Sequence, residues 1–171
     1  VQETNKALDR KRNILAAAGL LQEGISVEEQ FKSVQTRIVD LRTGKFADDS
    51  VADNFDQRKA SKDPQLSDAL DPEQDIAKVF RREHYSLVYL LKDPDGGIGK
   101  IVLPVRGYGL WSTLYGYIAL ESDANTVAGI GFYEHGETPG LGGEVDNPRW
   151  KSLWPGKQVY RDGEVQIGLV K

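Results

Sequence analysis

A glycine-rich segment at 135–143 excludes regular secondary structure at its place in the chain. It reads His-Gly-Glu-Thr-Pro-Gly-Leu-Gly-Gly, with four glycines and one proline. Glycine loses much conformational entropy in a helix or strand, and proline has no amide hydrogen to donate. Because an apolar, strand-like run at 127–133 precedes it, we predict a strand that opens into a loop. Such a loop can bring main-chain N–H groups to a phosphate or a flat ring, although a simple surface turn has the same composition.

The bulk composition indicates a folded domain with a small negative charge. Of the 171 residues, 39% are hydrophobic and 28% are charged, so we expect one domain with a sizeable core. The 26 acidic residues outnumber the 22 basic ones, which gives a net charge of −4. Because no basic run interleaved with aromatic residues occurs, we expect no nucleic-acid partner.

Missing residue types exclude several kinds of chemistry. The chain has no cysteine, which rules out disulfides, thiolate metal sites and cysteine nucleophiles. Its histidines, His84 and His135, are too few for most histidine-rich metal sites, so we predict no metal site. No apolar stretch is long enough to span a bilayer, and the chain starts at Val1 without any methionine. We therefore expect a processed product or a fragment, with any membrane anchor preceding Val1.

The N-terminal part of the sequence is predicted to be helical. Apolar residues from Leu8 to Leu21 recur at helical spacing, and Gly19 is a plausible end of the helix. Ser26 and Glu29 match a capping box ahead of a short helix that carries Phe31 and Val34. We interpret the polar tract 45–72 as a surface excursion, and we expect one more short helix at 73–82.

Short strands dominate the sequence from His84 onward. Runs rich in β-forming residues lie at 85–91, 100–105, 113–120 and 126–133, and a turn is expected at 93–97. A short helix at 147–154 and a final hairpin around 162–163 complete the pattern. The predicted class is α+β, with N-terminal helices packed on a twisted antiparallel β-sheet. We expect an N-terminal helical segment at 1–35 and an α+β domain at 36–171.

Several motifs suggest chemistry but have simpler explanations. Residues 96–100 lack the first glycine and the Ser/Thr of a phosphate-binding loop, and a hairpin turn explains them. Pairs such as Glu134 with Glu137 have the residue types of a glycosidase acid and base, but exposed loop carboxylates are common. His135 beside these carboxylates is equally consistent with a solvated loop.

A second glycine-rich loop, at 106–112, contains Trp111 between two predicted strands. Core packing is the usual role of a tryptophan. Two glycine-rich loops at strand ends, one aromatic and one with a threonine and main-chain donors, would together suit a flat aromatic ligand that bears a phosphate.

The string Glu-Thr-Pro-Gly-Leu-Gly-Gly-Glu-Val at 137–145, followed by Asn147-Pro148 and Trp150, resembles a family of flavin-binding subunits. That family includes the C subunit of the sodium-translocating NADH:quinone oxidoreductase (Nqr) and the G subunit of the Rnf electron-transport complex. Gly-Leu-Trp-Ser at 109–112, the segment 52–60 and the opening residues 5–9 favour the Nqr member. The resemblance covers essentially the whole chain.

The resemblance implies an FMN-binding domain that relays electrons within a membrane complex which oxidises NADH, reduces ubiquinone and pumps sodium. It implies a transmembrane anchor before Val1, a soluble domain on the periplasmic side of the bacterial inner membrane, and the other subunits of the complex as partners. It assigns no catalytic residue. It places six residues at or near the flavin: Trp111, Glu137, Thr138, Leu141, Gly142 and Lys171.

The family carries FMN on a threonine through a phosphoester bond, in a Ser-Gly-Ala-Thr type motif located after the position that matches Lys171. None of the threonines in this sequence has that context. We therefore expect the fragment to lack the covalent attachment and to be catalytically incomplete by itself. Two other hypotheses remain open, namely a flavin-free docking scaffold of a membrane complex and an Rnf-type protein.

Overall fold

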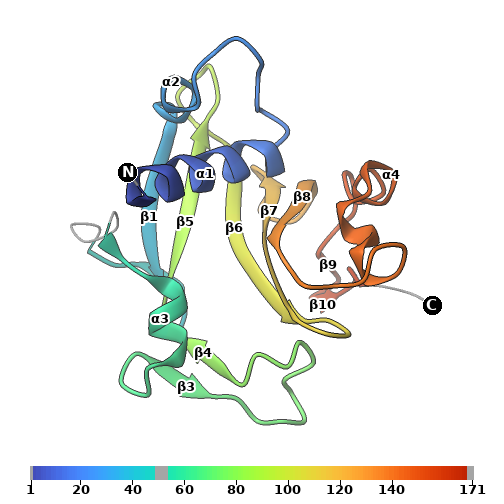
Figure 1. The fold of residues 1–171 in the computed structure, drawn as a ribbon. Coiled ribbons are helices and arrows are strands. Elements are labelled where there is room, and N and C mark those ends of the chain that lie inside the picture. The colour runs from blue at the N-terminus through green and yellow to red at the C-terminus, as the bar shows by residue number, and fades with distance from the viewer. Residues whose placement is uncertain (1, 49–53, 169–171) are drawn as a thin grey trace.

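The computed structural model describes residues 2–48 and 54–168, and its centre is a six-stranded antiparallel sheet (Figure 1). Its strand order is β2-β1-β5-β6-β7-β8. The bounds of these strands, in chain order, are β1 Val34–Asp40, β2 Lys45–Phe46, β5 Tyr85–Lys92, β6 Ile98–Tyr108, β7 Thr113–Glu121 and β8 Val127–Glu134. Helices together with an antiparallel sheet confirm the predicted α+β class.

The remaining helices and strands surround this sheet. Two small hairpins pair β3 with β4 and β9 with β10. The remaining bounds are α1 Gln2–Ala17, α2 Val27–Phe31, α3 Gln57–Lys62, β3 Ser67–Ala69, β4 Arg81–Glu83, a 3-10 helix η2 Gly142–Asp146, α4 Pro148–Lys151, β9 Tyr160–Arg161 and β10 Glu164–Val165.

Helix α1 crosses one face of the sheet and forms the core with it (Figure 1). Ile14 and Ala17 are buried against residues of the central strands, among them Val102 and Ala119, which are fully buried. The helix ends as predicted, because Gly19 has a φ of +71° and donates to the carbonyl of Ala16. The predicted division at 35/36 remains a prediction. Within the described residues, no helix is both long and apolar enough to cross a membrane.

Two helical predictions were wrong. Val34 begins strand β1 rather than lying in the capped helix, which ends at Phe31. No helix forms at 73–82, because the carboxylate of Asp75 accepts hydrogen bonds from the N–H groups of Val79 and Phe80. Such side-chain contacts to the nearby main chain compete with helical hydrogen bonds.

The sheet brings two loops to the same end. In the β6–β7 hairpin Tyr108 pairs with Thr113, so the connection 109–112 lies at the tip. On the next strand, Glu134 pairs with Tyr115 of β7 close to that tip. The glycine-rich segment that follows Glu134 therefore starts beside the loop that contains Trp111.

Candidate functional site

The side chain of Glu137 joins the two glycine-rich loops. Its Oε1 accepts hydrogen bonds from the N–H of Trp111 at 3.1 Å, the N–H of Ser112 at 3.0 Å and the hydroxyl of Ser112 at 3.1 Å. Its Oε2 accepts from the N–H of Leu110 at 3.2 Å. Glu137 is 7% exposed. The loop 109–112 is therefore folded around a buried carboxylate that belongs to the loop after β8.

These donors keep Glu137 ionised. Desolvation of the carboxyl favours its neutral form, but the N–H groups of Trp111, Ser112 and Leu110 and the Ser112 hydroxyl favour the anion. The balance lowers the pKa of Glu137 below its ordinary value. The charged carboxylate is thus the form that holds the loops together.

Glycine at two positions is required by this carboxylate. A Cβ added to Gly109 would lie 2.5 Å from Oε1 of Glu137, and one added to Gly142 would lie 2.5 Å from Oε2. Since real side-chain carbons do not approach so closely, any larger residue would displace Glu137. Gly109 and Gly142 therefore allow the two loops to meet.

The second loop contains a tight turn. The carbonyl of Thr138 accepts hydrogen bonds from the N–H of Leu141 at 3.1 Å and of Gly143 at 3.0 Å. Pro139 and Gly140 occupy the central positions, and Gly140 has a φ of +77°. Proline followed by glycine with positive φ is the sequence signature of a type II turn. This turn places Leu141 at the outer surface of the loop.

His135 supports the loop through both ring nitrogens. Its Nδ1 accepts from the N–H of Glu137 at 3.2 Å, and its Nε2 lies 2.7 Å from the carboxylate of Asp146. No group of three or more metal-ligating side chains occurs in the described parts of the chain. The carboxylate of Glu134 pairs with Arg58 at 2.7 Å, and that of Glu137 is fully engaged, so neither is poised as a general acid or base.

Large apolar side chains are exposed on both loops. Leu110 is 68%, Trp111 69% and Leu141 65% exposed. Thr138 is also exposed, and among the described residues its hydroxyl has no hydrogen-bond partner. An indole, an aliphatic side chain and a free hydroxyl on two connected loops form an open surface that suits a flat, partly apolar ligand.

The structure thus brings together five of the six predicted site residues. Trp111, Thr138 and Leu141 present side chains at the surface, whereas Glu137 and Gly142 hold the loops in place. Lys171 lies outside the described residues. The contribution of Ser112 was missed, because a serine next to a tryptophan gives no sign that it will bind a carboxylate from a distant loop.

A family model described as "FMN-binding domain" matches residues 109–167, which include both loops. The chain is 53% identical to the C subunit of the Na(+)-translocating NADH-quinone reductase of Pseudomonas aeruginosa, over 99% of this chain and 67% of that protein. It is 45% identical to the protein of the same name from Yersinia pestis, over 99% of this chain and 65% of that protein. The chain spans about two thirds of the length of these relatives.

Two solved structures share the fold. The crystal structure of Shewanella oneidensis NqrC superposes with a TM-score of 0.89 at 40% identity, over 98% of this chain and 77% of that one. The crystal structure of the corresponding Na(+)-translocating NADH-quinone reductase C subunit from Parabacteroides distasonis gives a TM-score of 0.73 at 27% identity, over 96% and 72%.

Proposed function

The chain belongs to the NqrC family, the C subunits of the Na(+)-translocating NADH-quinone reductases, and on this premise we propose that it is an FMN-binding electron-transfer component of such a complex. The observation that carries the proposal is the connection of two loops by Glu137, which leaves Trp111 and Leu141 as exposed side chains on one joined surface. The family model for FMN binding matches the stretch that contains both loops.

The residues present fit a flavin mononucleotide. Trp111 and Leu141 are too exposed for core residues, and a flat isoalloxazine would cover their apolar surface. The Thr138 hydroxyl and the main chain of the glycine-rich turn are polar groups of the kind that bind ring carbonyls or a phosphate. Because Gly109 and Gly142 have no side chains, the two loops can approach each other at Glu137.

Bound FMN would supply one- and two-electron transfer. The protein residues would set its surroundings. Trp111 and Leu141 would exclude water from the ring. The ionised Glu137 would fix the loop positions, with its charge stabilised by four hydrogen-bond donors. Fixed dipoles and restricted water are the means by which a protein adjusts the potential of a cofactor.

The assembly is proposed on the same premise. The relatives are named as subunits of a reductase, so we propose that this chain acts with the other subunits of a membrane complex that couples NADH oxidation to quinone reduction and sodium transport. A membrane anchor before Val1, a periplasmic position of the domain and covalent attachment of FMN to a threonine beyond Lys171 remain parts of this proposal.

A titration of FMN followed by flavin fluorescence tests the function. We expect a saturable rise in the fluorescence anisotropy of FMN with the wild type, a signal that does not depend on the indole of Trp111. The variants Trp111→Ala and Leu141→Ala should each weaken binding about tenfold. Leu153→Ala is the matched control, since Leu153 is also 65% exposed but lies outside both loops. Equal binding by all the variants would contradict the proposal.

A further inference from the structure

A groove of about 850 Å³ lies on the sheet face that α1 crosses, and none of its described lining residues belongs to the loops 109–112 or 135–143. One wall is α1, with Lys6 and Arg10, and the other is the segment 54–58 at the start of α3. The floor is formed by side chains of the four strands β5 to β8. Its volume is in the range of ligand-binding sites.

Tyrosine rings run across the floor. Tyr89 and Tyr117 have ring centroids 6.0 Å apart in an edge-on arrangement, and Tyr117 and Tyr133 stack at 5.4 Å. Burial raises the pKa of both Tyr89 and Tyr117, so their hydroxyls stay neutral. Tyr133 is 43% exposed and ends the row. Tyr89 and Tyr117 are only 3% and 5% exposed, so within this row Tyr133 is the ring whose surface a ligand can reach.

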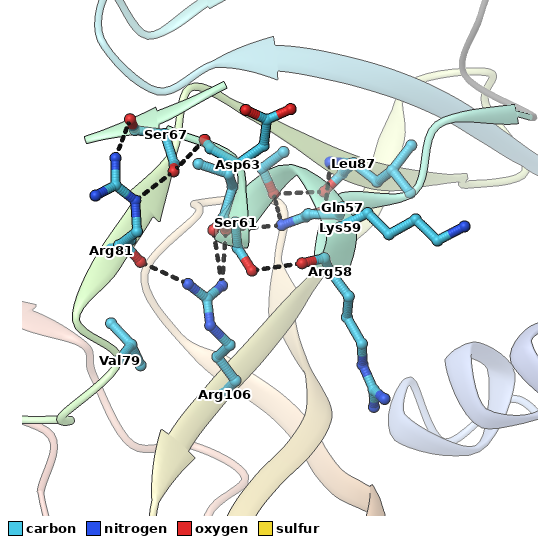
Figure 2. Close-up of polar contacts among 12 residues, drawn as sticks. Gln57, Arg58, Lys59, Ser61, Asp63, Ser67, Val79, Arg81, Leu87 and Arg106 are labelled. Atoms are coloured by element: carbon cyan, nitrogen blue, oxygen red, sulfur yellow. Dashed lines mark hydrogen bonds and ion pairs between the residues drawn. The ribbon is translucent and has the colours of Figure 1, made fainter. Parts of the chain in front are cut away.

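Arg58 forms the inner part of the second wall. Its guanidinium lies 3.4 Å from the ring centroid of Tyr115 and 2.7 Å from the carboxylate of Glu134. Figure 2 shows its side chain extending away from the polar contacts of Gln57 and Arg106, toward α1. The stacking on Tyr115 and the ion pair fix Arg58, and its charge is balanced by Glu134.

Among the described residues, the groove cations that have no carboxylate partner lie on α1, whereas the other three lie beside carboxylates. Arg12 lies 3.9 Å from Asp9, Arg58 pairs with Glu134, and Arg106 pairs with Glu83 at 2.8 Å.

Lys6 and Arg10 differ from these cations, because no carboxylate in the described part of the chain pairs with either of them. They are four residues apart on one helix, so they lie on the same side of α1 and face the groove together.

These features favour a peptide over a small molecule. Small-molecule sites are enclosed and mostly apolar, whereas this groove has a charged rim around an aromatic floor. Tyrosine and arginine with a polar rim are typical of the contact surfaces between proteins. We propose that the groove binds an extended acidic segment of a partner protein, with an apolar side chain on the exposed ring of Tyr133 and carboxylates at Lys6 and Arg10. This proposal does not depend on flavin binding.

Fluorescence anisotropy with a fluorescein-labelled peptide, Glu-Asp-Phe-Glu-Asp-Leu, tests it. We expect saturable binding to the wild type, and binding at least about tenfold weaker for the double variant Lys6→Glu/Arg10→Glu. The matched control is Lys59→Glu/Lys62→Glu, which makes the same change of charge on α3 at residues that do not line the groove. A peptide with lysine in place of each acidic residue should not bind.

The wild type and the two double variants also distinguish the other possible outcomes of the peptide-binding experiment. Loss of binding in both double variants would mean that only net charge matters, and retained binding in Lys6→Glu/Arg10→Glu would place the peptide elsewhere. Either result would overturn the proposal. It would also be overturned if the peptide failed to bind while vesicles containing phosphatidylglycerol bound the wild type but not Lys6→Glu/Arg10→Glu, because the two cations would then serve a lipid surface.

Discussion

The carboxylate of Glu137 accepts a hydrogen bond from the main-chain N–H of Trp111 at 3.1 Å, so the two residues that were expected to flank one ligand are connected to each other. The contact links the loop after β8 to the β6–β7 connection. It gives Glu137 a positioning role, because its oxygens face protein donors rather than the surface. The exposed Trp111 and Leu141 are then the residues available for direct contact with a flavin.

Glu137→Gln should separate the loops. A glutamine has one acceptor oxygen, and its amide group would face main-chain N–H groups that need an acceptor. We expect FMN binding to weaken about tenfold and the melting temperature to fall. Glu144→Gln is the control, because Glu144 is exposed and, among the described residues, its carboxylate accepts only from the side-chain amide of Asn147. Calorimetric titration with FMN checks the affinities, and similar values for the two variants would argue against the positioning role.

The contribution of Glu137 to stability should depend on pH. Its pKa in the folded protein lies below the ordinary value of about 4.3, so its contribution is complete above that value. It is lost as the pH falls through the lower, folded-state pKa, because protonation in the folded state removes the charge that binds the donors. Glu137→Gln cannot titrate at this position. The difference in melting temperature between the wild type and this variant should therefore shrink from about pH 7 to about pH 3. A difference in melting temperature that does not change with pH would contradict the lowered pKa of Glu137.

Gly129→Ala should loosen the contact of α1 with the sheet. A Cβ at Gly129 of β8 would collide with the carbonyl oxygen of Ala17, at the end of α1. Since a main-chain atom cannot move aside cheaply, we expect a loss of about 1–3 kcal/mol in the free energy of unfolding. Gly131→Ala on the same strand is the control, because nothing lies within 4 Å of its added Cβ. Urea unfolding of both variants checks the prediction, which fails if they unfold at the same midpoint.

Arg106→Met should be strongly destabilising. Arg106 pairs with Glu83, which is 6% exposed, and also donates to the carbonyl of Arg81 (Figure 2). Removing the guanidinium leaves a buried carboxylate without its cation, at an expected cost of about 3–5 kcal/mol. Lys100→Met breaks a 4.0 Å pair with Glu121, whose side chain is 45% exposed, and should change stability by less than about 1 kcal/mol. Comparable losses of unfolding free energy for the two variants in urea would show that burial of an ion pair does not determine the cost of breaking it.

The strands from Tyr85 onward could be predicted because β-forming residues and turn signals alternate there. Helix α3 could not, since its sequence Gln-Arg-Lys-Ala-Ser-Lys has no apolar periodicity. It is held by long-range contacts instead. The amide of Gln57 bonds to Glu83, Ser86 and the main chain of Leu87, between 26 and 30 residues away (Figure 2).

The candidate site was also predicted only in part. Composition indicated two glycine-rich loops, and the family resemblance indicated their residues. The role of Glu137 depends on donors 25 to 27 residues earlier in the chain, which local patterns cannot reveal. The pairing of β6, β7 and β8 decides which loops meet, and this pairing appears only when the sheet is assembled.

The most direct test of the flavin site is a map of amide chemical shifts in ¹⁵N-labelled protein during titration with FMN. We predict that the largest changes are confined to residues 110–112 and 138–143, together with the indole N–H of Trp111. The groove between α1 and α3 should remain unchanged, and its residues serve as an internal control. Changes centred on Tyr133 and Arg10, with the two loops unaffected, would contradict the assignment of the flavin to the loops that Glu137 joins.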